Sequence, residues 1–196
     1  EFLQVGAECI GEKNYLADIE ILMLAFESLQ TVGIKDISID FSNPIFLNII
    51  LNSKLINNNK RQDFIKYLRR KDLKKSLSFL KNDSKNIFVK NLIECTGILK
   101  DKIKLLDSLR IDHKTNIEVD NLLRVYKYVK SKFKKIKFNI DFTENRFHSY
   151  YSGLNFIIFA KNVRGEIASG GRYLTSYTNG EDATGFTCYM DSILRA

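Results

Sequence analysis

The chain has 196 residues, of which 44% are hydrophobic and 12% aromatic, and it carries a net charge of +8. This length and composition suit one globular domain, and no apolar run approaches the roughly 20 residues that a membrane-spanning helix needs. The three cysteines are far apart and lack Cys-x-x-Cys spacing, which argues against a metal site and favours a reduced, cytoplasmic compartment. The chain lacks an initiator Met and opens inside a predicted strand, so we expect a fragment of a longer protein.

Residues 2–10 are apolar and end at Gly11, which predicts a buried strand. Gln4, Gly6 and Glu8 share one face of that strand because side chains alternate along it. An amide and a carboxylate on one face can contact the same ligand, although ordinary exposed polar residues would give the same pattern.

Further elements follow in order. Residues 18–31 predict a helix with a broad apolar face, an acidic first turn and Gly33 just beyond its end. Strict alternation over residues 36–41 predicts a half-buried strand. The same patterns predict a short helix over 45–51, an amphipathic helix over 119–133 and a strand over 136–142.

Residues 55–109 show apolar residues at three- and four-residue steps, broken by two polar turns and by Gly97. We expect several short helices that form an insertion in the sheet domain. Basic residues are dense from Lys60 to Lys137, which could serve an RNA surface. Because lysine is abundant throughout the chain, solvated helix faces explain the same charge, and we do not expect a nucleic-acid partner.

The final stretch has the most distinctive pattern. An aromatic pair, Tyr150-Tyr151, precedes an apolar strand over 154–160. A predicted glycine turn at Gly170-Gly171 follows, and then a strand that runs into a helix. Glycines let a ligand approach the backbone, and tyrosines offer rings and hydroxyls. The pattern indicates a small-molecule pocket on antiparallel strands.

These residues resemble the catalytic core of histidyl-tRNA synthetase and of its relative, the regulatory subunit of ATP phosphoribosyltransferase. The tyrosine pair resembles the histidine-specific signature, Gly170-Gly171-Arg172-Tyr173 follows it as in the family, and residues 183–192 resemble motif 3 of class II synthetases. Residues 2–11 resemble the second half of motif 2. The resemblance implies an α+β fold, with a mostly antiparallel sheet of the class II synthetase type flanked by helices, as one domain over 1–196.

The resemblance also implies a histidine site. Glu8 matches a carboxylate that faces the amino group of bound histidine, and Tyr151 matches the tyrosine nearest the imidazole. An arginine before the tyrosine pair bridges the histidine carboxylate and phosphate in the synthetases, and bidentate pairing explains why arginine is used there. The expected histidine-binding residues are Gln4, Glu8, Arg146, Tyr150, Tyr151, Gly170 and Gly171. We assign no catalytic residue, cofactor or metal ligand.

Motif 3 departs from the active synthetases. Their helix carries an arginine that binds the γ-phosphate of ATP beside an acidic residue, whereas here Ser192 follows Asp191 and a usual glycine is Tyr189. Loss of one charge-assisted contact removes on the order of 1.5–3 kcal/mol. Arg195 is one helical turn further on, displaced along the helix axis.

The leading hypothesis is therefore a non-catalytic regulatory subunit that binds histidine and assembles with the catalytic subunit of ATP phosphoribosyltransferase in the cytoplasm. The resemblance implies a homodimer of the full-length chain, formed through motif 1, which we do not recognise in this sequence. The alternative is a divergent or partial histidyl-tRNA synthetase that activates histidine and charges tRNA. A third hypothesis is an RNA-binding module that uses the basic helices.

Overall fold

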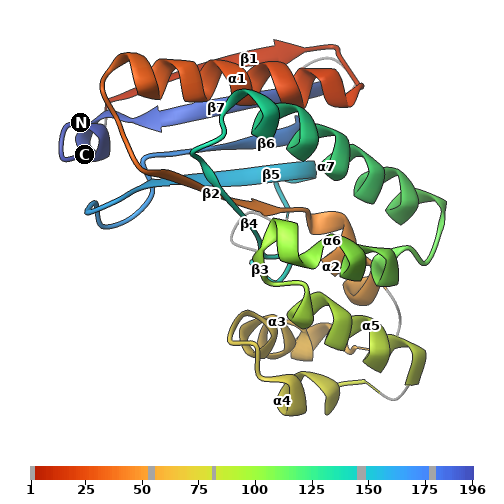
Figure 1. The fold of residues 1–196 in the computed structure, drawn as a ribbon. Helices are drawn as coiled ribbons and strands as arrows, with labels where there is room; N and C mark the ends of the chain where they lie inside the picture. The colour runs from red at the N-terminus through yellow and green to blue at the C-terminus, as the bar shows by residue number, and fades with distance from the viewer. Residues whose placement is uncertain (1–2, 53–55, 81–82, 145–148, 177–179) are drawn as a thin grey trace.

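The computed structural model describes residues 3–52, 56–80, 83–144, 149–176 and 180–196. Within these ranges seven strands form one sheet in the order β1-β7-β6-β5-β2-β4-β3 (Figure 1). The strands are β1 (Gln4–Ile10), β2 (Ile37–Ser42), β3 (Gly97–Ile98), β4 (Lys137–Ile140), β5 (Tyr151–Ala160), β6 (Ala168–Leu174) and β7 (Asp182–Tyr189). The helices are α1 (Tyr15–Thr31), α2 (Pro44–Leu51), α3 (Arg61–Arg69), α4 (Leu73–Leu77), α5 (Asp83–Glu94), α6 (Leu99–Leu106), α7 (His113–Lys132) and α8 (Met190–Ile193), with short 3-10 helices η1 (Asn58–Lys60) and η2 (Asp107–Leu109).

Strand direction is mixed at one place in the sheet. Strands β2 and β4 are parallel, whereas the other neighbouring pairs in the described ranges are antiparallel. Parallel neighbours need a long crossover connection, and the chain between β2 and β4 provides one because it contains α2 to α7. The predicted α+β fold, a mostly antiparallel sheet flanked by helices, is confirmed.

Helices α1 and α7 lie on one face of the sheet (Figure 1). Helix α1 begins at the N-cap Asn14, whose side chain accepts a hydrogen bond from the backbone N–H of Leu16, and Gly33 follows its end with a φ of 89°. Its buried residues pack on β7 and β1, and α7 packs on α1 and β5. Glu8 on β1, Thr187 on β7 and Ser169 on β6 lie on the opposite face, where they are exposed or half-buried.

Strand β1 differs from its prediction as a buried strand. Within the described residues it pairs with β7 alone, so it is an edge strand of the sheet. Leu3 and Val5 are 64% and 58% exposed, and Ala7 and Cys9 are the half-buried residues of the strand. An apolar pattern alone does not distinguish a central strand from an edge strand, because both have one face packed on the core.

The predicted glycine turn at Gly170-Gly171 is wrong. Both glycines lie inside β6, between β5 and β7. A Cβ on Gly170 would lie 2.3 Å from the carbonyl oxygen of Gly185, and a Cβ on Gly171, where φ is 149°, would lie 2.5 Å from the Cβ of Asn155. The glycines are therefore required by the close approach of neighbouring strands rather than by chain reversal.

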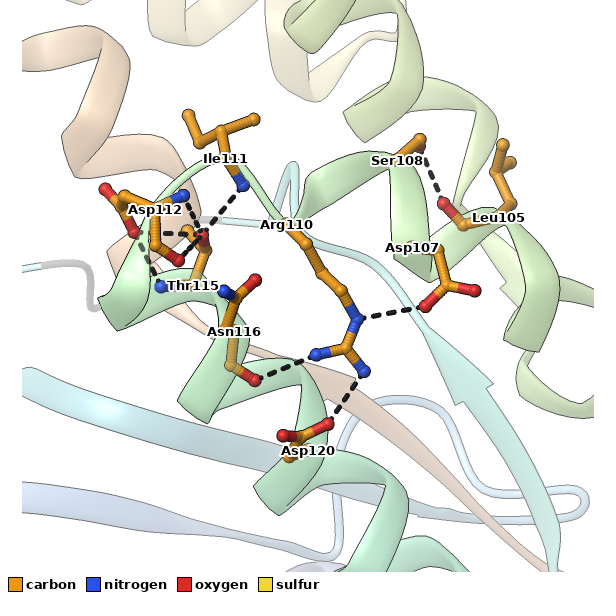
Figure 2. A network of polar contacts seen from close by, with 9 residues as sticks. All are labelled: Leu105, Asp107, Ser108, Arg110, Ile111, Asp112, Thr115, Asn116 and Asp120. Atoms are coloured by element: carbon orange, nitrogen blue, oxygen red, sulfur yellow. Dashed lines mark hydrogen bonds and ion pairs between the residues drawn. The ribbon is translucent and has the colours of Figure 1, made fainter.

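Helices α3, α4 and α5 gather at the end of the molecule away from β1 (Figure 1). Gly97, which the sequence predicts as a helix break, begins the short strand β3 that pairs with β4. Figure 2 shows the junction that leads from η2 into α7. There the Arg110 guanidinium donates to Asp107 at 2.9 Å and to Asp120 at 2.8 Å, and Asp112 and Thr115 form a capping box at the start of α7.

Among the described residues, no helix is both long enough and apolar enough to cross a membrane.

Candidate functional site

A hollow lies on the sheet face opposite α1, where β1, β5 and β6 meet the carboxyl-terminal part of α2. Its volume is about 820 Å³, which falls in the usual range of small-molecule pockets. We call it the tyrosine hollow. Its described lining residues are Glu8, Ile10, Asn48, Asn52, Ser149, Tyr150, Tyr151, Ser152, Tyr173, Leu174, Thr175 and Ser176.

Three tyrosines form one wall of this hollow. The ring of Tyr150 stacks on Tyr173 with centroids 5.2 Å apart and planes 16° apart, and it meets Tyr151 edge-on at 5.0 Å. Burial raises the pKa of Tyr151 to about 12, and the nearby Tyr150 and Tyr189 add to this. Burial also raises the pKa of Tyr173, and its hydrogen bond to Glu8 adds to the shift. The hydroxyls of Tyr151 and Tyr173 therefore stay protonated at neutral pH, and the Tyr173 hydroxyl donates to the Glu8 carboxylate.

Glu8 lies above a floor without side chains. It is opposite Gly185 on β7, which is opposite Gly171 on β6. A Cβ on Gly185 would come within 2.8 Å of the Glu8 Cγ, so glycine leaves space for the carboxylate. A ligand in the tyrosine hollow can reach both the carboxylate and the backbone beside it.

Gln4 shares the exposed face of β1 with Glu8 but lines a different hollow. This second hollow has a volume of about 500 Å³. Its described lining residues are Leu3, Gln4, Gly165, Glu166, Tyr189, Asp191, Ser192 and Arg195. The side chain of Arg195 turns back on α8, where its Nε donates to the carbonyl oxygen of Asp191 at 2.9 Å and its Nη2 lies 3.4 Å from the Ser192 hydroxyl.

The structure thus separates the expected site residues. Glu8, Tyr150 and Tyr151 line the tyrosine hollow, Gln4 lines the second hollow, and Gly171 lies in the floor beside Glu8. Gly170 lies toward the core, since its Cβ would meet the Phe156 ring at 2.6 Å. Arg146 lies outside the described residues.

Sequence reasoning missed the role of Arg172, which joins the site to α1. Its guanidinium lies 3.1 Å from the Asp18 carboxylate and donates to the carbonyl oxygens of Glu12 and Asn14 at 2.9 and 2.8 Å. Thr184 on β7 also donates to Asp18. The ion pair is buried, with 11% and 6% of the two side chains exposed. Asp18 and Arg172 are far apart in the sequence, and no sequence pattern connects them. This contact therefore could not be predicted from the sequence.

Sequence reasoning also missed the wall formed by α2. Asn48 and Asn52 are one helical turn apart and both line the tyrosine hollow. Ser152 on β5 lines it as well, and its buried hydroxyl has no hydrogen-bond partner among the described residues. These side chains add hydrogen-bonding groups to the lining of the tyrosine hollow.

The open sheet face, with its hollow between the edge strand that carries Glu8 and a tyrosine-bearing hairpin, has the architecture of a class II aminoacyl-tRNA synthetase core. Solved structures support this class. A protein from Bacillus halodurans described as an ATP phosphoribosyltransferase regulatory subunit/histidyl-tRNA synthetase matches with a TM-score of 0.80 and 21% identity, over 98% of this chain and 52% of that one. An ATP phosphoribosyl transferase (HisG:HisZ) complex from Thermotoga maritima matches with a TM-score of 0.76 and 19% identity, over 96% of this chain and 66% of that one.

A family model and curated relatives also identify the family to which the chain belongs. The family model described as Histidyl-tRNA synthetase matches residues 1–193, so the chain belongs to the histidyl-tRNA synthetase family, as the resemblance predicted. A protein of Paramagnetospirillum magneticum named ATP phosphoribosyltransferase regulatory subunit is 30% identical over all of this chain and 51% of its own length. A Histidine--tRNA ligase of Saccharolobus solfataricus is 28% identical over 88% of this chain and 42% of its own length. The chain spans about half the length of the curated relatives it matches.

Proposed function

We propose that this chain is the ligand-binding core of a non-catalytic regulatory subunit of ATP phosphoribosyltransferase. In this proposal the cytoplasmic, full-length protein is a homodimer, binds free histidine in the tyrosine hollow and regulates a separate catalytic subunit. Relatives about 30% identical over the whole chain carry the name of that regulatory subunit. One solved structure with the same fold is that of an ATP phosphoribosyl transferase complex.

The observation that carries the proposal is the contrast between the two hollows. The tyrosine hollow offers Glu8 to an ammonium group, three aromatic rings to a flat side chain and several hydroxyls to ring nitrogens. Charge-assisted hydrogen bonds of this kind are stronger than neutral ones. A free amino acid with a polar aromatic side chain fits this combination of groups.

The second hollow is poorly suited to a triphosphate. Among its described lining residues the carboxylates of Glu166 and Asp191 outnumber the single guanidinium of Arg195. Arg195 already bonds to its own helix, and Ser192 brings no charge. Because like charges repel, this balance of charges opposes the binding of a triphosphate such as ATP.

The test uses the full-length protein mixed with the short catalytic subunit of the same organism. We expect the regulatory protein to raise the rate of the catalytic subunit, and histidine to change that rate in the mixture. Glu8→Gln should weaken the response to histidine without abolishing the basal activation, because the amide keeps an oxygen that can accept from the Tyr173 hydroxyl but loses the charge that attracts an ammonium group. Absence of any effect of the full-length protein on the catalytic rate would refute the regulatory role.

A partial histidyl-tRNA synthetase is the second candidate, because Arg195 does line the second hollow and one relative is named Histidine--tRNA ligase. This candidate requires ATP binding and histidine-dependent exchange of pyrophosphate into ATP. Detection of that exchange with the full-length protein would replace the regulatory proposal.

A further inference from the structure

Another hollow lies at the sheet edge opposite β1, where α6 and α7 meet β3 and β4. Its volume is about 340 Å³. We call it the lysine hollow, because its described lining includes Lys100, Lys130, Lys135 and Lys137. The apolar part of the lining includes Ile98 on β3, Tyr126 on α7 and Phe138 on β4. Cations and apolar groups therefore share one depression of the surface.

The lysine hollow forms because β3 is too short to cover β4. Strand β3 has two residues and pairs only with Asn139 and Ile140 of β4. The chain then turns into α6 at Leu99, so in the described ranges no strand pairs with Lys137 or Phe138 on that side. An edge of this kind is a place where a segment of another chain can lie against a sheet.

The floor of the lysine hollow is apolar and fixed in position. The Tyr126 ring packs edge-on against Phe138 with centroids 5.3 Å apart. The Lys130 ammonium group lies 5.4 Å from the centroid of the same Phe138 ring. At the rim Ile98 is 52% exposed, so it offers apolar surface to an occupant.

Positive charge surrounds this floor. Residues 127–137 contain six lysines and no acidic residue. Lys130 is already used, because it donates to the carbonyl oxygens of Lys134 and Ile136 at 2.6 and 3.0 Å. The other three lysines of the hollow have no ion-pair partner within the described part of the chain. Their ammonium groups are free to pair with an occupant.

Two carboxylates lie close to the lysine hollow but outside its described lining. Asp101 on α6 adds to the burial that raises the pKa of Tyr126, and Asp40 on β2 accepts a hydrogen bond from Asn139 at 2.9 Å. The three free lysines outnumber these two acids. An occupant that carries carboxylates therefore complements the charge of this surface.

Two simpler explanations account for part of the pattern. Lysines discourage the pairing of exposed strand edges, and basic residues are favoured near the carboxyl end of a helix such as α7. Neither explains an apolar floor between the cations, with Ile98 exposed at its rim. The phosphates of RNA would use the lysines and leave the apolar floor without a partner, whereas a peptide provides both kinds of group.

We propose that the lysine hollow is the docking site for an acidic segment of the catalytic subunit, which places an apolar side chain beside Ile98 and carboxylates beside the free lysines. This inference rests on the proposed function, because it names the surface through which the regulatory chain meets its partner. The tyrosine hollow lies among β1, β5 and β6, toward the other edge of the sheet. A segment docked in the lysine hollow therefore leaves the tyrosine hollow open to histidine.

The experiment measures binding of the catalytic subunit to the full-length protein by biolayer interferometry. Lys135→Glu combined with Lys137→Glu reverses two charges of the lysine hollow. The matched control, Lys127→Glu combined with Lys132→Glu, reverses two exposed charges of the same segment outside the described lining. Because salt at about 0.15 M screens exposed charges beyond about 8 Å, the hollow variant should bind about tenfold more weakly and the control within about twofold of the unaltered protein. Equal losses in the two variants, or no loss in the hollow variant, would overturn the proposal.

Ile98→Thr tests the apolar part of the docking site. Threonine keeps the branched shape that suits β3, and it is a favourable residue at the N-cap of α6, so the fold should be kept. We expect binding of the catalytic subunit to weaken about threefold to tenfold. Ile87→Thr on α5, where the side chain is 61% exposed, is the matched control and should change the affinity less than about twofold. Unchanged binding by Ile98→Thr would show that the apolar floor is not used, and the proposal would be wrong.

Carbodiimide cross-linking of the complex, followed by mass spectrometry, identifies the occupant, because the reagent joins a lysine to a carboxylate in contact with it. We expect cross-links from Lys135 or Lys137 to an acidic segment of the catalytic subunit. Cross-links to a second regulatory chain, or to another part of the same chain, would overturn the proposal. RNA binding that the hollow variant weakens, with binding of the catalytic subunit unchanged, would also overturn it.

The docking site and the proposed function fail in different ways. If the unaltered full-length protein neither binds nor activates the catalytic subunit, the proposed function is refuted and the docking site with it. If the unaltered protein binds and activates, and both the hollow variant and Ile98→Thr bind equally well, only the docking site is refuted.

Discussion

The buried pair of Arg172 and Asp18 gives the sharpest prediction about the fold of the site. Replacement of Arg172 with Met keeps the length of the side chain and removes the guanidinium. Asp18 would then be buried beside Thr184 without its cation. The strand that carries Gly171 and Tyr173 would also lose its link to the residues that precede α1.

The expected loss in the free energy of unfolding can be estimated from the surroundings of the Arg172–Asp18 ion pair. Removal of one partner of a buried ion pair costs about 3–5 kcal/mol, because the remaining charge stays out of water. The exposed carbonyl oxygens of Glu12 and Asn14 can turn to water, so their loss adds little. Since typical domains are stable by about 5–15 kcal/mol, Arg172→Met could leave too little folded protein. Arg172→Lys, which keeps the charge, should lose about 1.5–3 kcal/mol, the value of a charged hydrogen bond.

The free energy of unfolding of Arg172→Met should depend on pH with a definite sign. Burial raises the pKa of Asp18, and Arg172 opposes that shift. Without Arg172 the folded state binds the Asp18 proton more tightly than the unfolded state does. The free energy of unfolding of the variant should therefore increase as pH falls from 8 through the folded pKa, and should level off below the ordinary value of about 3.9. Below that value both states are protonated.

The assay is urea denaturation followed by circular dichroism, at several pH values. The matched control is Asp18→Asn combined with Arg172→Met, which removes both charges and should be more stable than Arg172→Met alone. A loss below about 1 kcal/mol in Arg172→Met, or a double variant less stable than the single one, would refute the assignment of a buried charge pair.

Two further predictions concern the floor and the wall of the tyrosine hollow. Gly171→Ala should lower the free energy of unfolding by about 1–3 kcal/mol in urea denaturation, because its Cβ would lie 2.5 Å from that of Asn155. Gly153→Ala, whose Cβ would come no closer than 3.1 Å to the Arg172 side chain, should cost less, and equal losses would contradict the argument. Tyr150→Ala should weaken histidine binding about threefold to tenfold in calorimetry, because it removes the ring stacked on Tyr173. Tyr150→Phe keeps that ring and should retain the affinity, and equal losses in the two variants would refute a role for stacking.

Periodicity and turn residues were sufficient to predict most of the fold. The alternation of residues 36–41 predicts β2 to within a residue at each end, and the helix predicted over 45–51 is α2, which begins one residue earlier at Pro44. Helix α7 begins six residues before its predicted start, at the capping box of Asp112 and Thr115. A short polar pattern of this kind is easily taken for a loop, because its apolar residues are sparse.

The candidate site could be predicted only in part, because its shape depends on contacts between strands and helices that are distant in the sequence. Strand alternation places Gln4 and Glu8 on one face, but the division of that face into two hollows depends on how β7 and α8 end. The glycine pair is typical of a turn in sequence, whereas its use inside β6 depends on the neighbouring strands. The contacts of Arg172 with α1 and of Ser169 with Tyr189 join residues whose proximity exists only in the folded sheet.

The most direct test of the account is calorimetric titration of histidine, and separately of ATP, into the full-length protein at neutral pH. The contrast between the two hollows predicts that histidine binds with one site per chain and that ATP gives no binding heat. Binding of ATP with an affinity like that of histidine would contradict the regulatory proposal and favour the synthetase. Absence of histidine binding would contradict the assignment of the tyrosine hollow.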